Sequence, residues 1–158
     1  MERLEDCISF LLGKAYQHVN QAAKRRLAPY GVTPVQYALL NVLWERDEQS
    51  SSELGDRLQL DSATMTGIID RLEQAGLVER RLHPEDRRVN LVQLTVRGRT
   101  LQASLDQELA ELNNDYFGRF RPDDATRLRS MLAVLGNINV ASTSAISNEQ
   151  LYRNEEQQ

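Results

Sequence analysis

The chain has 158 residues, of which 41% are hydrophobic, 27% charged and 6% aromatic, which is typical of one helix-rich globular protein. No apolar run approaches the ~20 residues that a membrane span needs, and the acidic segment Met1–Asp6 lacks the basic start of a signal peptide. We therefore expect a cytoplasmic protein with no membrane partner. A single cysteine, Cys7, excludes an intrachain disulfide, and with only two histidines we expect no metal and no cofactor.

The net charge of −4 is unusual for a nucleic-acid-binding protein, so its distribution along the chain matters. Acidic and basic residues balance in residues 1–49 and again in residues 50–99, and the acidic excess falls entirely in residues 100–158. A neutral middle segment can still present a basic face where its arginines cluster. The charge therefore argues only weakly against a nucleic-acid partner.

Two helices are predicted at the start of the chain. An apolar stripe at spacings of three and four predicts an amphipathic helix over about Leu4–Leu27, which Pro29–Gly31 ends. Thr33 as N-cap, Pro34 at the first helical position and Gln36 at N3 then predict a second, largely buried helix that reaches about residue 46.

Two shorter helices and a hairpin are predicted next. After a polar break, Ser50 and Glu53 form a capping box for a helix that ends near Leu58. Asp61 or Ser62 caps the following helix, which Gly76 ends. Beyond Gly76 the period changes to that of strands, and two short runs flank a turn-rich segment: residues 77–82, 83–88 and 89–94.

The last third predicts two more helices, a long one capped by Thr95 and a final one from Pro122 to about residue 138. The fold class is therefore mainly α with a small β-hairpin wing. We expect a winged helix-turn-helix domain (residues 31–98) between an N-terminal dimerisation helix (residues 1–30) and C-terminal dimerisation helices (residues 99–138). A flexible polar tail (residues 139–158) is expected to follow. Burying the apolar stripes of the terminal helices against a second chain predicts a homodimer.

The third helix predicts a DNA-binding surface. At 100 degrees per residue, one face collects the apolar residues Met65, Ile68, Ile69 and Leu72. The opposite face holds small, hydroxyl-bearing or polar residues: Ala63, Thr64, Thr66, Gly67, Asp70, Arg71 and Gln74. Such a face lets the backbone enter the major groove, whereas an ordinary exposed helix prefers Lys, Glu and Gln. Asp70 is expected either to accept from a cytosine amino group or to hold Arg71.

The hairpin tip predicts a second contact. Arg87 and Arg88 lie at or just past the turn, where an arginine can enter a narrow minor groove. Asp86 is expected to fix the guanidinium by accepting its hydrogen bonds. Taken alone, these three residues fit a solvated charged turn better than a DNA contact.

Together these segments resemble the MarR family of transcription regulators, over about residues 4–138. The matching segments are Thr33-Pro34-x-Gln36-Tyr37, Leu60-Asp61-Ser62-Ala63-Thr64-Met65-Thr66, Arg71-Leu72-Glu73, Gly76-Leu77-Val78-Glu79-Arg80, Pro84-Glu85-Asp86-Arg87-Arg88 and Leu94-Thr95-x-x-Gly98. The resemblance implies a homodimer that represses transcription from a palindromic operator in double-stranded DNA. It further implies that Asp86 holds Arg88 in the wing and that the major-groove positions are Ser62, Ala63, Thr64, Thr66, Gly67 and Arg71.

The family resemblance also implies release of DNA by a small, often aromatic anionic effector. Cationic and aromatic residues on the first two helices are candidates for its site: Lys14, His18, Tyr37, Asn41 and Trp44. Core packing is the alternative for Tyr37 and Trp44, and for His18 the alternative is a histidine with an ordinary hydrogen-bond partner or in solvent.

Three other functions are weighed. Peroxide-sensing members of the family carry a cysteine where this chain has Ser9. Two residues on a helix are rotated by about 200 degrees, so Cys7 is expected to point in another direction. We therefore expect Cys7→Ser to leave DNA release unchanged, with a redox response as the alternative. A winged-helix adaptor that does not bind DNA would tolerate alanine at Arg88. No enzyme is expected, because no nucleophile motif, phosphate loop or ligand-spaced cluster, and hence no catalytic residue, is present.

Overall fold

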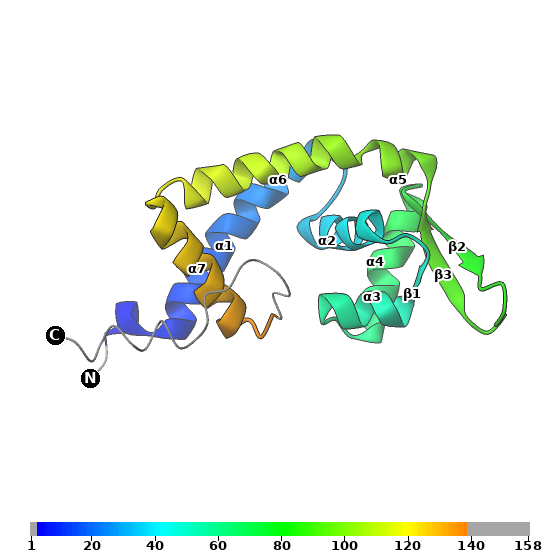
Figure 1. The fold of residues 1–158 in the computed structure, drawn as a ribbon, viewed down its shortest axis with the longest axis horizontal. Helices are drawn as coiled ribbons and strands as arrows, with labels where there is room; N and C mark the ends of the chain where they lie inside the picture. Colours follow the sequence, from blue (N-terminus) through cyan, green and yellow to red (C-terminus); the bar gives the residue numbers. More distant parts are fainter. Residues whose placement is uncertain (1–2, 139–158) are drawn as a thin grey trace. The chain divides into compact units, whose positions relative to one another are not determined.

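The structure is a computed structural model that describes residues 3–138 (Figure 1). The chain divides into two compact units after Tyr116. The predicted polar tail, residues 139–158, lies outside the described residues. Among the residues that are described, no helix combines the length and the apolar character that a membrane crossing requires.

The fold is mainly helical with one small antiparallel sheet, as the sequence predicts. The helices are α1 (Ile8–Leu27), α2 (Pro34–Glu45), α3 (Ser51–Leu58), α4 (Ser62–Gln74), α5 (Val96–Thr100), α6 (Gln102–Phe117) and α7 (Pro122–Leu135), with short 3-10 turns at Leu4–Asp6 and Ala28–Tyr30. The strands are β1 (Gln49–Ser50), β2 (Val78–Leu82) and β3 (Asn90–Leu94).

The predicted N-caps of α2, α3 and α4 are confirmed. Gln36 and Thr33 form a reciprocal capping box on α2, and Ser50 and Glu53 form another on α3. Asp61, rather than Ser62, is the N-cap of α4, and its carboxylate accepts from the backbone N–H of Thr64. Each cap satisfies N–H groups that the first turn of a helix leaves without a partner.

Two predicted helices are divided. The first does not run from Leu4, because Cys7 has extended backbone angles (φ −75°, ψ 120°) and α1 begins only at Ile8. The helix after Thr95 is split at Leu101 into α5 and α6. Leu101 keeps helical angles, and its carbonyl still accepts from the N–H of Leu105, so the path of the chain continues across the division.

The sheet contains a strand that the sequence does not predict. β2 and β3 form the expected hairpin, with Val78 opposite Leu94, and β1 pairs with the far side of β3, giving the order β1-β3-β2. Gln49 of β1 is buried and donates from its side-chain amide to the carbonyl of Val42. The polar break between α2 and α3 is therefore tied to the sheet.

The hydrophobic core of the first unit fixes the orientation of α4. Helices α2 to α4 gather beside the hairpin, and α6 adds Leu105 to the same core (Figure 1). Its fully buried large side chains include Leu39, Leu40, Leu43, Leu54, Met65, Ile69, Leu72, Leu77 and Leu105. Because these residues hold one side of α4 inside, its opposite side faces out.

Candidate nucleic-acid interface

Helix α4 has the two faces that its sequence predicts. Met65, Ile68, Ile69 and Leu72 are all buried. On the other side, Gly67 is half-buried and the remaining predicted major-groove positions are exposed: Ser62, Ala63, Thr64, Thr66 and Arg71. The Arg71 side chain makes no hydrogen bond or ion pair within residues 3–138. Its charge is therefore available to an outside partner.

Gly67 has no structural reason inside the chain. Its backbone is helical, and a Cβ added there meets no atom within 4 Å. Glycine in the middle of a helix costs about 1 kcal/mol relative to alanine. Gly55 on α3 differs, because its Cβ would lie 3.1 Å from the carbonyl oxygen of Leu60. Within residues 3–138, no packing contact therefore requires glycine at position 67.

Two threonine hydroxyls on this face already have acceptors. Thr64 Oγ1 donates to Asp61 Oδ2 at 2.6 Å, and Thr66 Oγ1 donates to the carbonyl oxygen of Ser62 at 2.9 Å. The hydrogen bond from the Thr64 hydroxyl lowers the pKa of Asp61. In this arrangement both threonines offer an outside partner a methyl group and oxygen lone pairs.

Of the two roles expected for Asp70 from the sequence, the one within the chain is wrong. Asp70 does not hold Arg71; its Oδ1 accepts from Arg80 Nη2 of β2 at 2.5 Å. Glu73, one turn further along α4, accepts from the backbone N–H and from the guanidinium of the same arginine. The carboxylate on the outward side of α4 is thus neutralised within the chain.

The wing tip has the expected pair. Asp86 Oδ1 accepts from the backbone N–H of Arg88 at 3.0 Å and from its Nε at 3.1 Å, and these bonds lower the pKa of Asp86. The Arg88 side chain is nonetheless 91% exposed, and Arg87 makes no polar contact within the described part of the chain. At the base of the turn, His83 Nδ1 accepts from two backbone N–H groups.

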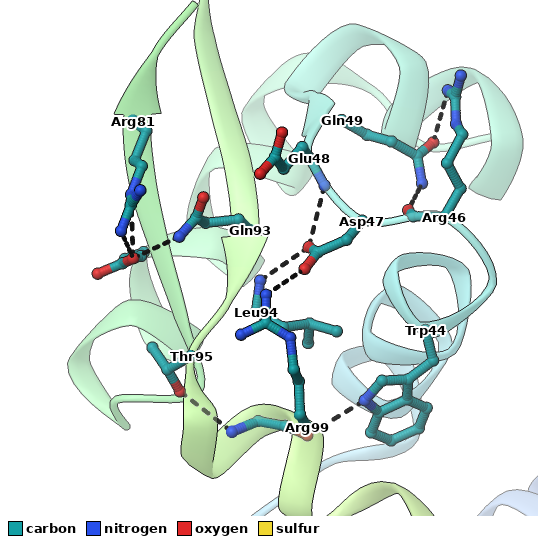
Figure 2. Close-up of polar contacts among 12 residues, drawn as sticks. Trp44, Arg46, Asp47, Glu48, Gln49, Arg81, Gln93, Leu94, Thr95 and Arg99 are labelled. Carbon is teal, nitrogen blue, oxygen red and sulfur yellow. Dashed lines mark hydrogen bonds and ion pairs between the residues drawn. The ribbon is translucent and has the colours of Figure 1, made fainter.

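The sequence does not predict a polar junction that lies where β3 ends and α5 begins (Figure 2). Asp47, between α2 and β1, accepts from the backbone N–H of Leu94 at 2.9 Å and from Arg99 Nη2 at 2.6 Å. Its carboxylate therefore joins the end of β3 to α5. Nothing in the local sequence signals this contact, because its partners are 47 and 52 residues away.

The same junction includes Trp44 and Gly98. Trp44 Nε1 donates to the carbonyl oxygen of Gly98 at 3.1 Å (Figure 2). A Cβ at Gly98 would lie 2.1 Å from the carbonyl oxygen of Leu77, a distance no carbon can occupy. The glycine of the Leu-Thr-x-x-Gly motif is therefore required by the close approach of α5 to the chain before β2.

Of the predicted effector residues, three lie together on α2. The Tyr37 hydroxyl donates to Asp106 of α6 at 3.0 Å and accepts from Asn41 at 3.4 Å. Burial and the hydrogen bond to Asp106 raise the pKa of Tyr37 to about 12. The Tyr37 and Trp44 rings meet edge to face, with centroids 5.9 Å apart. Both rings also pack against the core, as the alternative interpretation holds.

The other two predicted effector residues are on α1. Lys14 lies near the Phe10 ring, and His18 Nδ1 lies 2.9 Å from the Tyr116 hydroxyl. Tyr116 and Asp106 are ten residues apart on α6, so the two groups are separated by ~15 Å along that helix. No described contact joins the two groups. Between them Arg26 of α1 pairs with three carboxylates of α6: Glu108, Glu111 and Asp115.

Cys7 does not point away from Ser9, contrary to the prediction from one continuous helix. Cys7 is the N-cap of α1, and its Sγ lies 3.1 Å from Ser9 Oγ. The Ser9 hydroxyl, followed by the backbone N–H groups of Phe10 and Ser9, lowers the pKa of the Cys7 thiol. The two side chains are therefore adjacent.

These observations define a class of protein. A helix with an exposed, nearly bare face is followed by a hairpin that carries arginine at its tip, which is the arrangement of a winged helix-turn-helix protein. A family model described as "MarR family" matches residues 32–89.

Similar proteins agree with this class. The HTH-type transcriptional regulator MhqR of Bacillus subtilis strain 168 is 31% identical over 82% of this chain and 79% of that protein. The organic hydroperoxide resistance transcriptional regulator of the same organism is 31% identical over 84% of this chain and 89% of that protein. The chain thus belongs to the MarR family and is a transcription regulator of that family.

Solved structures share the fold. The transcriptional repressor CouR, bound to a 23-mer DNA duplex, matches with a TM-score of 0.78 and 25% identity over 86% of this chain and 99% of that chain. CouR from Rhodococcus jostii RHA1 bound to p-coumaroyl-CoA matches with a TM-score of 0.76 and 27% identity, over 91% of this chain and all of the other.

Proposed function

We propose that this protein is a homodimeric repressor that binds a palindromic operator in double-stranded DNA and is released by a small effector. Helix α4 enters the major groove through its six outward positions, and Arg88, steadied by Asp86, enters the adjacent minor groove. The observation that carries the proposal is Gly67, a helical glycine for which the interior of the chain has no use. The DNA-bound structure of CouR supports the same use of the fold.

Unpartnered apolar side chains support the dimer. Helix α1 and the turn before it expose Leu4, Ile8, Leu11 and Tyr16. In the second unit of the chain, helix α7 exposes Met131, Leu132, Val134 and Leu135. Apolar surface of this extent on helices is stabilised by a second copy of the chain. Two-fold symmetry then places one α4 on each half of a palindrome, ~34 Å apart.

The effector proposal rests on how α2 is tied to α5 and α6. Tyr37 donates to Asp106, and Trp44 donates to the carbonyl of Gly98, so both rings link the winged module to the helices that follow it. An aromatic anion that displaces either bond would change the position of α4 relative to the dimer axis. A ligand that favours another spacing weakens binding to both half-sites together. The p-coumaroyl-CoA complex of CouR supports this ligand class.

The proposal is tested by fluorescence anisotropy with DNA from upstream of the protein's own gene, at several salt concentrations and with random-sequence competitor. We expect competitor-resistant binding whose affinity falls steeply with salt. Arg88→Ala should lower the affinity about tenfold and reduce the salt dependence. Arg81→Ala is the matched control, because Arg81 lies on the same hairpin but pairs with Glu79.

Three outcomes would contradict the proposal. Binding no tighter to the upstream DNA than to competitor at any salt concentration would argue against a sequence-specific regulator of that site. If specific binding is present and Arg88→Ala leaves it unchanged, the wing does not contact DNA as proposed. Retained function in Arg88→Ala with no DNA binding would favour the adaptor interpretation.

A redox response is a second candidate, favoured by the contact between Cys7 and Ser9. A thiolate at Cys7 would attack the distal oxygen of an organic hydroperoxide, breaking the O–O bond to leave a sulfenic acid and an alkoxide that takes a proton from water. The relative named for organic hydroperoxide resistance supports this substrate class. If the candidate is right, equimolar hydroperoxide releases DNA from the wild type and not from Cys7→Ser. Equal release from both proteins would exclude it.

A further inference from the structure

Arg80 joins the predicted recognition helix to the wing. Its guanidinium contacts Asp70 through Nη2 and Glu73 through Nη1, and its backbone N–H donates to Glu73 Oε1 at 3.2 Å. The two carboxylates are one turn apart on α4, while Arg80 lies in the middle of β2. Arg80 therefore joins the helix to the hairpin at three points, two through its side chain and one through its backbone N–H.

This contact also covers an open edge. β2 is an outer strand in the order β1-β3-β2, and Arg80 is opposite Val92 of β3. An outer strand leaves N–H groups without a partner, and Glu73 accepts the one at Arg80. The connection between α4 and β2 is short, with the N–H of Leu77 donating to the carbonyl of Leu72. The contacts of Arg80 with Asp70 and Glu73, called the brace below, add a second attachment beyond that turn.

Charge gives the brace a second effect. Asp70 and Glu73 are partly exposed on α4, and a carboxylate near phosphates would repel DNA. Arg80 places one positive charge between them and is itself only 29% exposed. It is therefore poorly placed to contact phosphate, although it lies on the DNA-binding module.

We propose that Arg80, with Asp70 and Glu73, is a positioning group that fixes the wing relative to α4, so that the major-groove contacts of α4 and the minor-groove contact of Arg88 form in one geometry. This inference rests on the proposed function. It assigns Asp70 to the brace rather than to a cytosine. It also predicts that the two DNA contacts are energetically coupled through Arg80.

Arg81, the next residue of the strand, provides a matched control. It pairs with Glu79 in the same strand and makes no described contact with α4. Replacing Asp70 and Arg80 by Asn and Gln removes most of the brace without changing net charge. Replacing Glu79 and Arg81 by Gln has the same charge balance and leaves the brace in place.

The test is a double-mutant cycle on DNA affinity, measured by anisotropy with the upstream operator. In the intact background Arg88→Ala should lower the affinity about tenfold. In the D70N/R80Q background the same substitution should lower it only about twofold, because the wing is no longer held in register. In the E79Q/R81Q background it should again lower the affinity about tenfold. Equal losses in all three backgrounds would overturn the proposal.

Folding and base reading are controlled separately. Circular dichroism melting shows whether each variant is folded at the assay temperature, and if D70N/R80Q is not, Asp70→Asn alone should show a smaller coupling of the same sign. Selection from randomised half-sites should give Asp70→Asn the same base preferences as the wild type. A preference changed at one base pair would assign Asp70 to base reading and contradict the brace. Absence of specific binding by the wild type would instead contradict the proposed function.

Discussion

Two glycines in the winged module illustrate two different reasons for a missing side chain. At Gly98, a Cβ would meet the carbonyl oxygen of Leu77 at 2.1 Å, so the interior of the protein requires glycine. At Gly67, a Cβ would meet nothing within 4 Å, and alanine would favour the helix. The first glycine serves the fold, and we propose that the second serves a surface that a partner approaches closely.

The surroundings of the two glycines differ in the same way. Near Gly98, the polar side chains have partners within the chain: Trp44 donates to the carbonyl of Gly98, and Arg99 donates to Asp47 (Figure 2). Near Gly67, Arg71 has no partner within the described residues. A region whose polar groups are satisfied internally contributes to stability. A region that leaves a cation and bare backbone exposed is available for binding.

The largest effect is expected for Gly98→Ala. The added methyl cannot fit beside Leu77 without moving α5 away from the chain before β2. The free energy of unfolding should therefore fall by ~3 kcal/mol or more. Urea denaturation followed by circular dichroism measures this difference. Stability within 1 kcal/mol of the wild type would mean that α5 adjusts freely and that the fold does not require glycine at position 98.

A smaller loss is expected for Asp47→Ala. Removing the carboxylate leaves the Leu94 N–H and the Arg99 guanidinium without their acceptor, which should cost about 2 kcal/mol in the free energy of unfolding. Asp47→Asn is the graded control, since its amide oxygen can still accept from Leu94. Urea midpoints should fall in the order wild type, Asn, Ala. An Ala variant as stable as the Asn variant would contradict the assigned role of the acceptor.

The smallest effect is a pH dependence at the start of α4. The pKa of Asp61 is lowered in the folded protein, so its ionised cap contributes stability above the ordinary carboxyl pKa, and this contribution is lost as the pH falls through the lower folded value. Asp61→Asn retains a capping oxygen that does not titrate. The stability advantage of the wild type over this variant should therefore narrow below about pH 4. A difference that is constant from pH 3 to pH 7 would contradict this.

The parts of the fold that the sequence predicts are those set by local contacts. The capping boxes at Thr33 and Ser50 join residues three apart, and the period of α4 alone determines which side is buried. Those signals are complete within one helix. The outward positions of α4 and the Asp86–Arg88 pair could be predicted for the same reason.

The parts that the sequence does not predict depend on distant partners. β1 has only two residues and becomes a strand through pairing with Val92 and Leu91 of β3. The partner of Asp70 is ten residues away on another element, so the choice between Arg71 and Arg80 needed the fold. The orientation of Cys7 needed the break before α1, which the apolar stripe does not mark.

The central claim is that the outward face of α4 is shaped for DNA, and Gly67→Ala tests it most directly. We predict a protein more stable by ~0.5–1 kcal/mol in urea denaturation. Its affinity for the operator should fall about tenfold or more, because the methyl keeps the backbone out of the groove. Gly13→Ala on α1, where a Cβ also meets nothing within 4 Å, should gain similar stability, and once gel filtration shows that it is dimeric it should retain the affinity. A stabilised Gly67→Ala variant that binds the operator as tightly as the wild type would contradict the claim.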